Sequence, residues 1–341
     1  MLSLLIFALT PLSLNLRRWA EHLVDGSWLV VGLYFLIFSV ILFAIDLPLN
    51  FYSGYNIEHT YGLSNLTKRG WTREMLKRQL FGFAFALVLV ELLYAIIRRW
   101  PNAWWLIAWI AWALGSIVLS KLWPVFIAPL FYKYERLSND ELRYRILDLI
   151  RGVNLKVENV YSMNLSKTTN KANAFFQGLG STRRVVLSDT LLRSFTADEI
   201  TVVVAHEAGH CKHRHIFKEI LFGILSSFLA FWIAFRSLEF FSDRLGIESA
   251  ADVAGFPLLS LVVVMFSLVL MPLGNLFSRS LEREADDFAL RTTKMKDAFI
   301  SAMKKLAFLN LADLNPHPVI EFFLYSHPSI QKRIRKAEAF N

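Results

Sequence analysis

The residues with the clearest chemical meaning are His206-Glu207-Ala208-Gly209-His210, an H-E-x-x-H motif. On a helix, histidines four residues apart project from one face, about 6 Å apart along the axis, which suits joint binding of one tetrahedral zinc ion. The carboxylate of Glu207 can then reach the open position of the metal and act as general base on a water molecule. A purely structural zinc site would leave Glu207 without a role. The motif therefore predicts a catalytic zinc site.

A third protein ligand is needed, and His213 is the nearest further histidine. Its Cα would lie about 10 Å from that of His206 along the helix axis, and no glycine follows His210 to fold the chain back toward the metal. We therefore interpret His213 and His215, which have basic neighbours, as residues at the membrane interface.

A carboxylate ligand is available near the end of the last apolar stretch. Glu282 and Asp286 are four residues apart and share a helical face. Glu282 can bind the zinc ion while Asp286 accepts a hydrogen bond from the distal nitrogen of a ligating histidine. Spacing alone does not choose between Glu282 and Glu284. Without the H-E-x-x-H motif, a solvated charged helix would be the preferred interpretation.

The elements that position these residues are predicted to cross a membrane. The chain has 341 residues, 55% of them hydrophobic and 19% charged, with a mean hydropathy of +0.41. A span needs about 20 apolar residues. Five windows approach this length, and Met1–Leu16 is a sixth candidate span that is short and contains Pro11. We therefore expect five to seven spans. The five windows of nearly uncharged residues are Trp28–Ile45, Leu80–Ile97, Ala103–Leu119, Ile220–Phe235 and Val253–Phe277.

The charge pattern predicts the orientation. The net charge of +9 indicates basic cytoplasmic loops rather than nucleic-acid binding. Residues 238–256 contain four acids and one base, whereas five bases lie in residues 68–78, which we expect to form an earlier loop. By the positive-inside rule the acidic loop is extracytoplasmic, so the polar segments on either side of the last two spans share the cytoplasmic face. The single cysteine, Cys211, excludes an intramolecular disulfide.

The first polar segment is predicted to combine helices with a small sheet. We expect a helix over Ser138–Arg151, a strand over Val157–Met163, and a hairpin of Asn173–Gln177 with Arg184–Leu187 around Gly178-Leu179-Gly180-Ser181. Thr196 and Glu199 form a capping box that starts the H-E-x-x-H helix. The predicted organisation is N-terminal transmembrane helices (1–131), a catalytic segment with the small sheet (132–216), a transmembrane helix pair (217–277) and a C-terminal catalytic segment (278–341).

The paired motifs, H-E-x-x-H and the downstream N-x-x-S-R-x-x-E-x-x-A-D, resemble those of the type 1 CAAX prenyl protease family of integral-membrane zinc metalloendopeptidases. Further similar stretches are Asn173-Ala174-Phe175, Val185–Leu191, and Ser326-His327-Pro328 with Arg333. The resemblance implies a mainly α, polytopic fold with a cytoplasmic-side zinc metalloprotease domain. It also implies one zinc ion per chain and Glu282 as the third ligand.

Further roles follow from the resemblance and from residue chemistry. The resemblance places His327 at the site, where it is a candidate donor to the oxyanion. Arg279 and Arg333 are candidates to orient carboxylates through bidentate hydrogen bonds. Asn173, Ala174 and Phe175 are candidates to bind an extended peptide by strand pairing, a role that the resemblance implies for the first two. A strand inside an ordinary sheet is an equally good interpretation of that segment by its pattern.

Two substrate classes and two other functions are the alternatives. The substrate is a peptide or protein that carries a prenyl group, or it is a membrane protein cleaved in quality control. A zinc transporter or metal-sensing membrane protein is a different class, but transport predicts ionisable ligands deep inside several spans. A catalytically inactive scaffold would not need Glu207. The expected partners are the substrate and the lipid bilayer, with no nucleic acid.

Overall fold

The computed structural model describes residues 1–178 and 183–340. The chain forms two compact units. The first comprises Met1–Glu58, Thr67–Gly115 and Phe222–Val269, and the second comprises His59–Leu66, Ser116–Leu221 and Leu270–Asn341.

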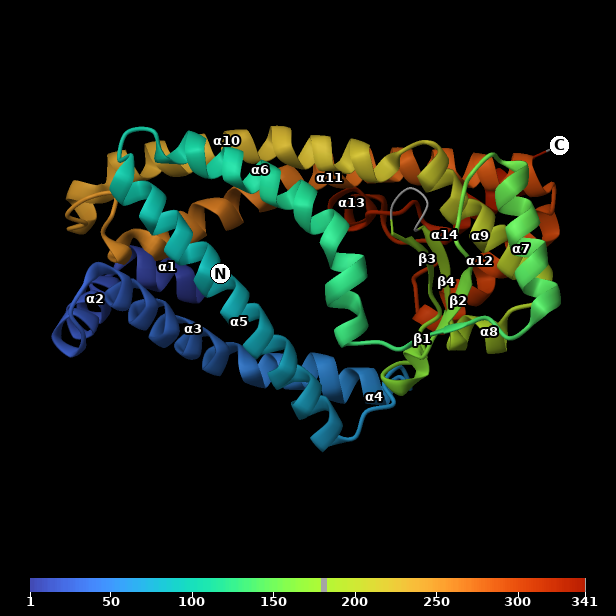
Figure 1. Cartoon of the computed structure of the whole chain (residues 1–341), viewed down its shortest axis with the longest axis horizontal. Coiled ribbons are helices and arrows are strands. Elements are labelled where there is room, and N and C mark those ends of the chain that lie inside the picture. Colours follow the sequence, from blue (N-terminus) through green and yellow to red (C-terminus); the bar gives the residue numbers. More distant parts are fainter. Residues whose placement is uncertain (179–182, 341) are drawn as a thin grey trace. The chain divides into compact units, whose positions relative to one another are not determined.

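Five helices of the described residues are long and apolar enough to cross a membrane, which confirms the five predicted spans (Figure 1). They are Ser27–Thr60, which combines α3 (Ser27–Phe51), a π-helical turn and α4 (Glu58–Thr60), then α5 (Lys68–Arg99), α6 (Trp104–Leu122), α10 (His215–Leu245) and α11 (Phe256–Thr293).

The opening stretch is not a continuous sixth span. It forms α1 (Leu2–Leu9, 8 residues) and α2 (Leu12–Leu23, 12 residues), each shorter than the about 20 residues that a span requires. Pro11, directly before α2, separates them because it donates no backbone hydrogen bond. The basic cluster that follows the first span is also not a loop, since residues 68–78 form the first turns of α5.

The first unit is held by apolar packing and by one buried ion pair. Its core packs Tyr34 and Phe38 of α3 against Tyr94 of α5 and the apolar faces of the other helices. Arg17 of α2 is bonded to Asp252 and to Glu248, both at 2.7 Å. Two acids of the predicted extracytoplasmic loop therefore bind α2.

The second unit contains a four-stranded sheet in the order β1-β2-β4-β3. The strands β2 and β4 are parallel, and the two outer pairs are antiparallel. The predicted strand and hairpin are present, while the predicted turn at residues 179–182 lies outside the described residues. The additional strand β1 is too short and too charged to be recognised in the sequence. The strands are β1 (Tyr134–Arg136), β2 (Val160–Met163), β3 (Ala174–Gln177) and β4 (Arg184–Ser188).

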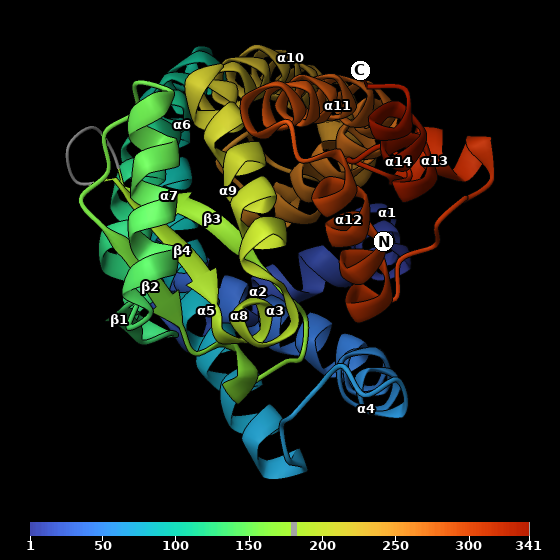
Figure 2. The same ribbon diagram turned by 90° about the vertical axis from the view of Figure 1, so that its right-hand side faces the viewer.

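The middle of helix α9 (Ala197–Lys212) is buried in the second unit. One face joins a cluster with the sheet and α7 (Asp140–Gly152), through Val204 and Ala208. Val202 and Ala205 join a second cluster with α11, α12 (Lys296–Asn310) and α14 (Ile330–Glu338). Figure 2 shows α9 between the sheet and α12. The run Ile200–Ala205 is buried throughout and is apolar apart from Thr201. The remaining helices of the unit are α8 (Asp189–Ser194) and α13 (Pro318–Leu324).

Candidate metal centre

Helix α9 is fixed at its start and ends sharply. The predicted capping box is present, with the Thr196 side chain accepting from the N–H of Glu199 and the Glu199 side chain accepting from the N–H of Thr196. Glu199 also binds Lys305 of α12 at 2.7 Å. At the other end, Arg214 adopts a positive φ of 56°, so α9 stops at Lys212 and α10 begins at His215. The H-E-x-x-H helix therefore does not continue into the membrane.

Helices α9 and α11 are in close contact at Gly209, within the H-E-x-x-H motif. A Cβ atom added to Gly209 would lie 3.1 Å from Cα of Ala285 and 3.2 Å from Cβ of Phe288. Only glycine permits this approach without displacing the backbone of α11. The contact brings the histidine face of α9 against the carboxylate face of α11.

His206, His210 and Glu282 form a compact set of donors. The two Nε2 atoms are 3.1 Å apart, and Glu282 lies 3.3 Å from Nε2 of His206 and 3.4 Å from Nε2 of His210. Donors at about 2.0–2.2 Å from a tetrahedral zinc ion are separated by about 3.3 Å. Oε2 of Glu282 is buried without a hydrogen-bond donor in the described chain, as expected of an atom that faces a cation. The donor set fits a divalent metal ion.

Asp286 and Arg333 contact His206 on the side of its ring that faces away from the other two donors. Oδ1 of Asp286 lies 2.9 Å from Nδ1 of His206, on the opposite side of the ring from Nε2. Arg333 of α14 donates to both carboxylate oxygens of Asp286, at 2.9 and 2.6 Å. All three side chains are buried. The carboxylate of Asp286 thus lies between the distal nitrogen of His206 and the guanidinium of Arg333.

Burial and neighbouring charges shift the pKa values of both histidines and of Glu207. Burial by itself would lower the pKa of His206, but the neighbouring carboxylates of Asp286 and Glu282 outweigh it and raise that pKa to about 9. Burial, with His206 nearby, lowers the pKa of His210 to about 4. Burial raises the pKa of Glu207. Two acids around one imidazole favour a positive charge at this place, which a divalent cation can supply, and a carboxyl group of raised pKa is suited to accept a proton.

His327 lies at the same centre, and Arg279 fixes the chain just before it. Nε2 of His327 is 3.2 Å from Oε1 of Glu282, and the His327 side chain is 58% exposed. Nη1 of Arg279 donates to the carbonyl oxygens of Glu321, at 3.0 Å, and Tyr325, at 2.5 Å. The structure therefore places Arg279 on main-chain carbonyls and not on a carboxylate.

The second glutamate of the motif, Glu284, belongs to a separate cluster. It lies 2.9 Å from His213, and 3.0 Å from both His215 and Lys218. His215 is 1% exposed, and its Nδ1 lies 2.9 Å from Nδ1 of His210. The interpretation of His215 as an interfacial residue was therefore wrong, because the turn at Arg214 directs His215 back against His210.

A cavity of about 380 Å³ opens onto the donor set. Its lining includes Glu207, His327, Asn173 and Ala174. Phe175 instead packs in a small cluster with Met163 and Val186. The cavity therefore joins two of the three predicted peptide-binding residues to the candidate metal centre.

Strand β3 presents an open edge to this cavity. It is the last strand of the sheet among the described residues. Asn173 accepts from the N–H of Ser188 and donates its own N–H to Oγ of Ser188, both at 2.9 Å. Since successive residues of a strand alternate in direction, the N–H and C=O groups of Ala174 face the open edge.

The five spans, the small sheet and the H-E-x-x-H helix with its carboxylate partner define a membrane-embedded metalloprotease. The description "Peptidase family M48" matches residues 136–341, and "CAAX prenyl protease N-terminal, five membrane helices" matches residues 1–133. The chain belongs to peptidase family M48. It is an integral, multi-pass metalloendopeptidase that acts on peptides or proteins and uses a metal cofactor.

Individual relatives agree with this assignment. The chain is 29% identical over 337 residues to the "Uncharacterized metalloprotease YhfN" of Bacillus subtilis, covering 98% of this chain and 79% of that protein. It is 29% identical over 310 residues to "CAAX prenyl protease 1" of Saccharomyces cerevisiae, covering 85% and 68%. The crystal structure of S. mikatae Ste24p matches with a TM-score of 0.87 and 26% identity, over 95% of this chain and 80% of that one.

Proposed function

We propose that the chain is a zinc endopeptidase that binds one zinc ion through His206, His210 and Glu282, with the active centre on the cytoplasmic side of the membrane. The observation that supports this most strongly is the placement of three donors, from two helices far apart in the sequence, within 4.8 Å of one another. Two imidazoles and one carboxylate, with a fourth position open, are typical of catalytic rather than structural zinc. A zinc ion bound there would polarise the scissile carbonyl group and acidify the attacking water.

The chain's own groups then perform the proton transfers. Glu207 takes a proton from the attacking water and later returns it to the leaving amine, which its raised pKa favours. His327 donates a hydrogen bond to the oxygen of the carbonyl group as negative charge develops on it. Asp286, held by Arg333, keeps the Nδ1 proton of His206 in place, so that Nε2 stays free to bind metal. Arg279 holds the segment that ends at His327.

The peptide is bound as an added strand along β3. The open N–H and C=O groups of Ala174 pair with its main chain, and the cavity beside Asn173 receives its side chains. Phe175 supports this strand from the opposite face. Main-chain pairing does not distinguish one peptide sequence from another. The choice of substrate therefore depends on the side-chain pockets and on the membrane anchor of the substrate.

The favoured substrate is a membrane-associated protein, with a prenylated C-terminal CAAX-type peptide as the first candidate. The name of the yeast relative supports this candidate. Quality-control cleavage of membrane proteins is the second candidate. It is compatible with main-chain recognition, which requires no lipid on the substrate.

One experiment separates these possibilities. The purified chain in detergent is given a farnesylated CAAX peptide, the same peptide without farnesyl, and an unfolded membrane protein, each with and without a chelator. We expect the chelator to stop cleavage and the farnesylated peptide to be cleaved fastest. Equal rates for both peptides, with efficient cleavage of the unfolded protein, would favour quality control.

Glu207→Gln tests the proposed chemistry in the same assay. It removes the proton acceptor and leaves the three ligands, so cleavage should fall by at least about a thousandfold while bound zinc stays near one ion per chain. Cleavage at a wild-type rate would rule out the role of Glu207. Zinc uptake into vesicles without any peptidase activity would favour the transporter.

A further inference from the structure

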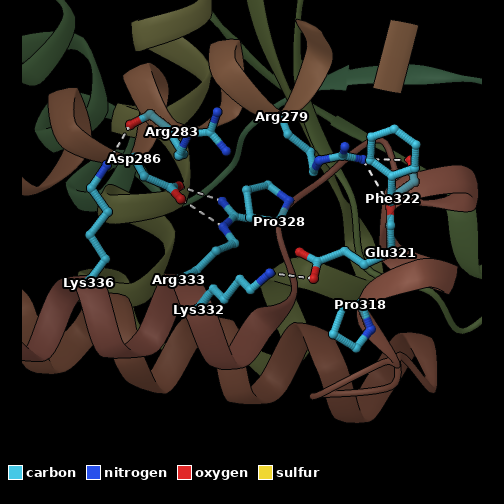
Figure 3. A pocket seen from close by; sticks show the side chains of 10 residues that line it. All are labelled: Arg279, Arg283, Asp286, Pro318, Glu321, Phe322, Pro328, Lys332, Arg333 and Lys336. Atoms are coloured by element: carbon cyan, nitrogen blue, oxygen red, sulfur yellow. Dashed lines mark hydrogen bonds and ion pairs between the residues drawn. The ribbon is translucent and has the colours of Figure 1, made fainter. Parts of the chain in front are cut away.

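A second cavity, of about 270 Å³, lies in the second unit and is lined by ten residues (Figure 3). Asp286 and Arg333 separate it from His206. The carboxylate of Asp286 binds His206 through one oxygen, while its side chain also lines this cavity. His206, Glu207 and Glu282 line the cavity at the metal centre and do not line this one, while Pro328 and Arg333 line both. The second cavity therefore adjoins the first across Pro328 and Arg333, but it contains none of the proposed metal ligands.

The lining carries five bases and two acids. Arg333 is paired with Asp286, Lys332 with Glu321 at 2.6 Å, and Lys336 with Asp287 at 2.7 Å. Each of these three bases is therefore balanced by an acid. Arg279 and Arg283 form no ion pair in the part of the chain that the structure describes, although Arg279 lies near enough to Glu321 to help lower the pKa of that carboxyl.

These two arginines present guanidinium N–H groups whose hydrogen bonds an anion could accept. They are four residues apart on α11, so they share a face of the helix. Arg279 is 6% exposed, and within the described chain it uses only Nη1 for hydrogen bonds. Arg283 makes no side-chain hydrogen bond to the described residues, and no dashed line leads to its guanidinium in Figure 3. Several guanidinium N–H groups thus remain available to phosphate oxygens.

The site lies where a lipid headgroup would be. Helix α11 is the last membrane span, and its apolar run ends at Phe277. At 1.5 Å per residue, Arg279 and Arg283 begin about 3 and 9 Å beyond that point. The headgroup layer extends about 5–8 Å from the edge of the hydrocarbon core.

Helix α13, which forms one wall of the cavity, has a surface suited to the same boundary. It is tied to α11 by Asn275, which donates to the carbonyl oxygen of Phe323 at 2.6 Å, and by Arg279. Its apolar side chains are between 43% and 63% exposed. Apolar side chains next to a basic cavity are typical of a segment that lies in the membrane interface. Those exposed residues are Val319, Ile320, Phe322, Phe323 and Leu324.

We propose that this cavity binds the phosphate of an anionic phospholipid, with Arg279 and Arg283 as its ligands and α13 against the acyl chains. The volume is below the about 300–1,000 Å³ typical of sites for whole small molecules, which suits a headgroup whose chains stay in the bilayer. The phosphate of the lipid pairs with both guanidinium groups, and the lipid anchors the segment between α11 and His327 to the membrane.

The test is native mass spectrometry of the full chain in detergent, titrated with phosphatidylglycerol or phosphatidylcholine. We expect a single phosphatidylglycerol to bind at least about fivefold more tightly than phosphatidylcholine. Arg283→Ala should weaken that binding by about five- to tenfold, and Arg283→Lys should restore most of it. Arg335→Ala is the matched control, because Arg335 is exposed on α14 and does not line the cavity. Replacing Val319 and Leu324 by serine should also weaken lipid binding.

Other outcomes would overturn the proposal. Equal losses for Arg283→Ala and Arg335→Ala would indicate nonspecific attraction. Complete displacement of the lipid by millimolar inorganic phosphate would indicate a site for a soluble anion. A higher KM of Arg283→Ala for a peptide with a free C-terminal carboxylate, with lipid binding unchanged, would assign the cavity to the substrate.

The proposal itself predicts that the peptidase activity of Arg283→Ala in lipid-free detergent is unchanged.

Discussion

Asp286 lies 2.9 Å from Nδ1 of His206, while Nε2 of the same ring faces Glu282 at 3.3 Å. One imidazole is thus held between two carboxylates that come from successive turns of α11. The outer carboxylate is in turn fixed by Arg333. This chain of contacts explains how a metal ligand can be oriented before a metal binds.

Asp286→Asn should weaken zinc binding by about 10- to 100-fold, because an amide holds the His206 proton less strongly than a carboxylate does. The measurement is competition with a fluorescent chelator. Asp287→Asn is the control, since Asp287 pairs with Lys336 and does not touch the donor set. Equal zinc affinity in the wild type and Asp286→Asn would contradict this role.

His327→Ala should lower kcat by about 100-fold and change KM little, because its hydrogen bond forms as charge develops on the carbonyl oxygen. His317→Ala is a close control. His317 also precedes a proline, but it caps α13 by accepting from the N–H of Val319. A loss confined to KM would mean that His327 only binds the substrate.

Ala174→Pro should lower kcat/KM by at least about tenfold without unfolding the sheet. Proline removes the outward N–H of this edge position and is tolerated on an edge strand. Ala174→Gly keeps the N–H and should retain most of the activity. Thermal unfolding of both variants checks that the sheet is intact, and equal activities would exclude strand pairing at Ala174.

Glu199→Gln should reduce the stability of the second unit at neutral pH by about 1.5–3 kcal/mol. Burial by itself would raise the pKa of Glu199, but hydrogen bonds from Lys305, Ser301 and the N–H of Thr196 outweigh it and lower that pKa. The stabilisation is therefore complete above the unfolded pKa of about 4.3 and is lost as the pH falls through the folded pKa.

Denaturant unfolding at several pH values, with chelator present throughout, measures this difference. The gap between wild type and Glu199→Gln should be constant near neutral pH and should shrink below about pH 4.3. Glu141→Gln, at an exposed first-turn acid of α7, should show almost no gap. A gap for Glu199→Gln that grows on acidification would have the opposite sign to the one expected.

The sequence predicted most of the helical framework and the types of residues at the site. Apolar windows and the Thr196–Glu199 capping box depend on local chemistry, which the sequence displays directly. The short strand β1 depends on pairing with β2, which local sequence does not specify. The break before α2 at Pro11 was visible but did not by itself exclude a span.

Tertiary contacts determined the remaining features of the site. Spacing on α11 suits Glu282 and Glu284 equally, and the close approach of Gly209 to Ala285 selects the face that carries Glu282. His215 was misinterpreted because Arg214 has no sequence signal for its positive φ. The pairing of Arg333 with Asp286 joins residues 47 positions apart, a separation that spacing cannot connect.

X-ray absorption at the zinc edge of the purified chain tests the metal centre most directly. The geometry of His206, His210 and Glu282 predicts a first shell of nitrogen and oxygen atoms at about 2.0–2.2 Å, with imidazole scattering from two histidines. A shell of sulfur at about 2.3 Å, which only Cys211 or a methionine of this chain could supply, would contradict the proposed ligands.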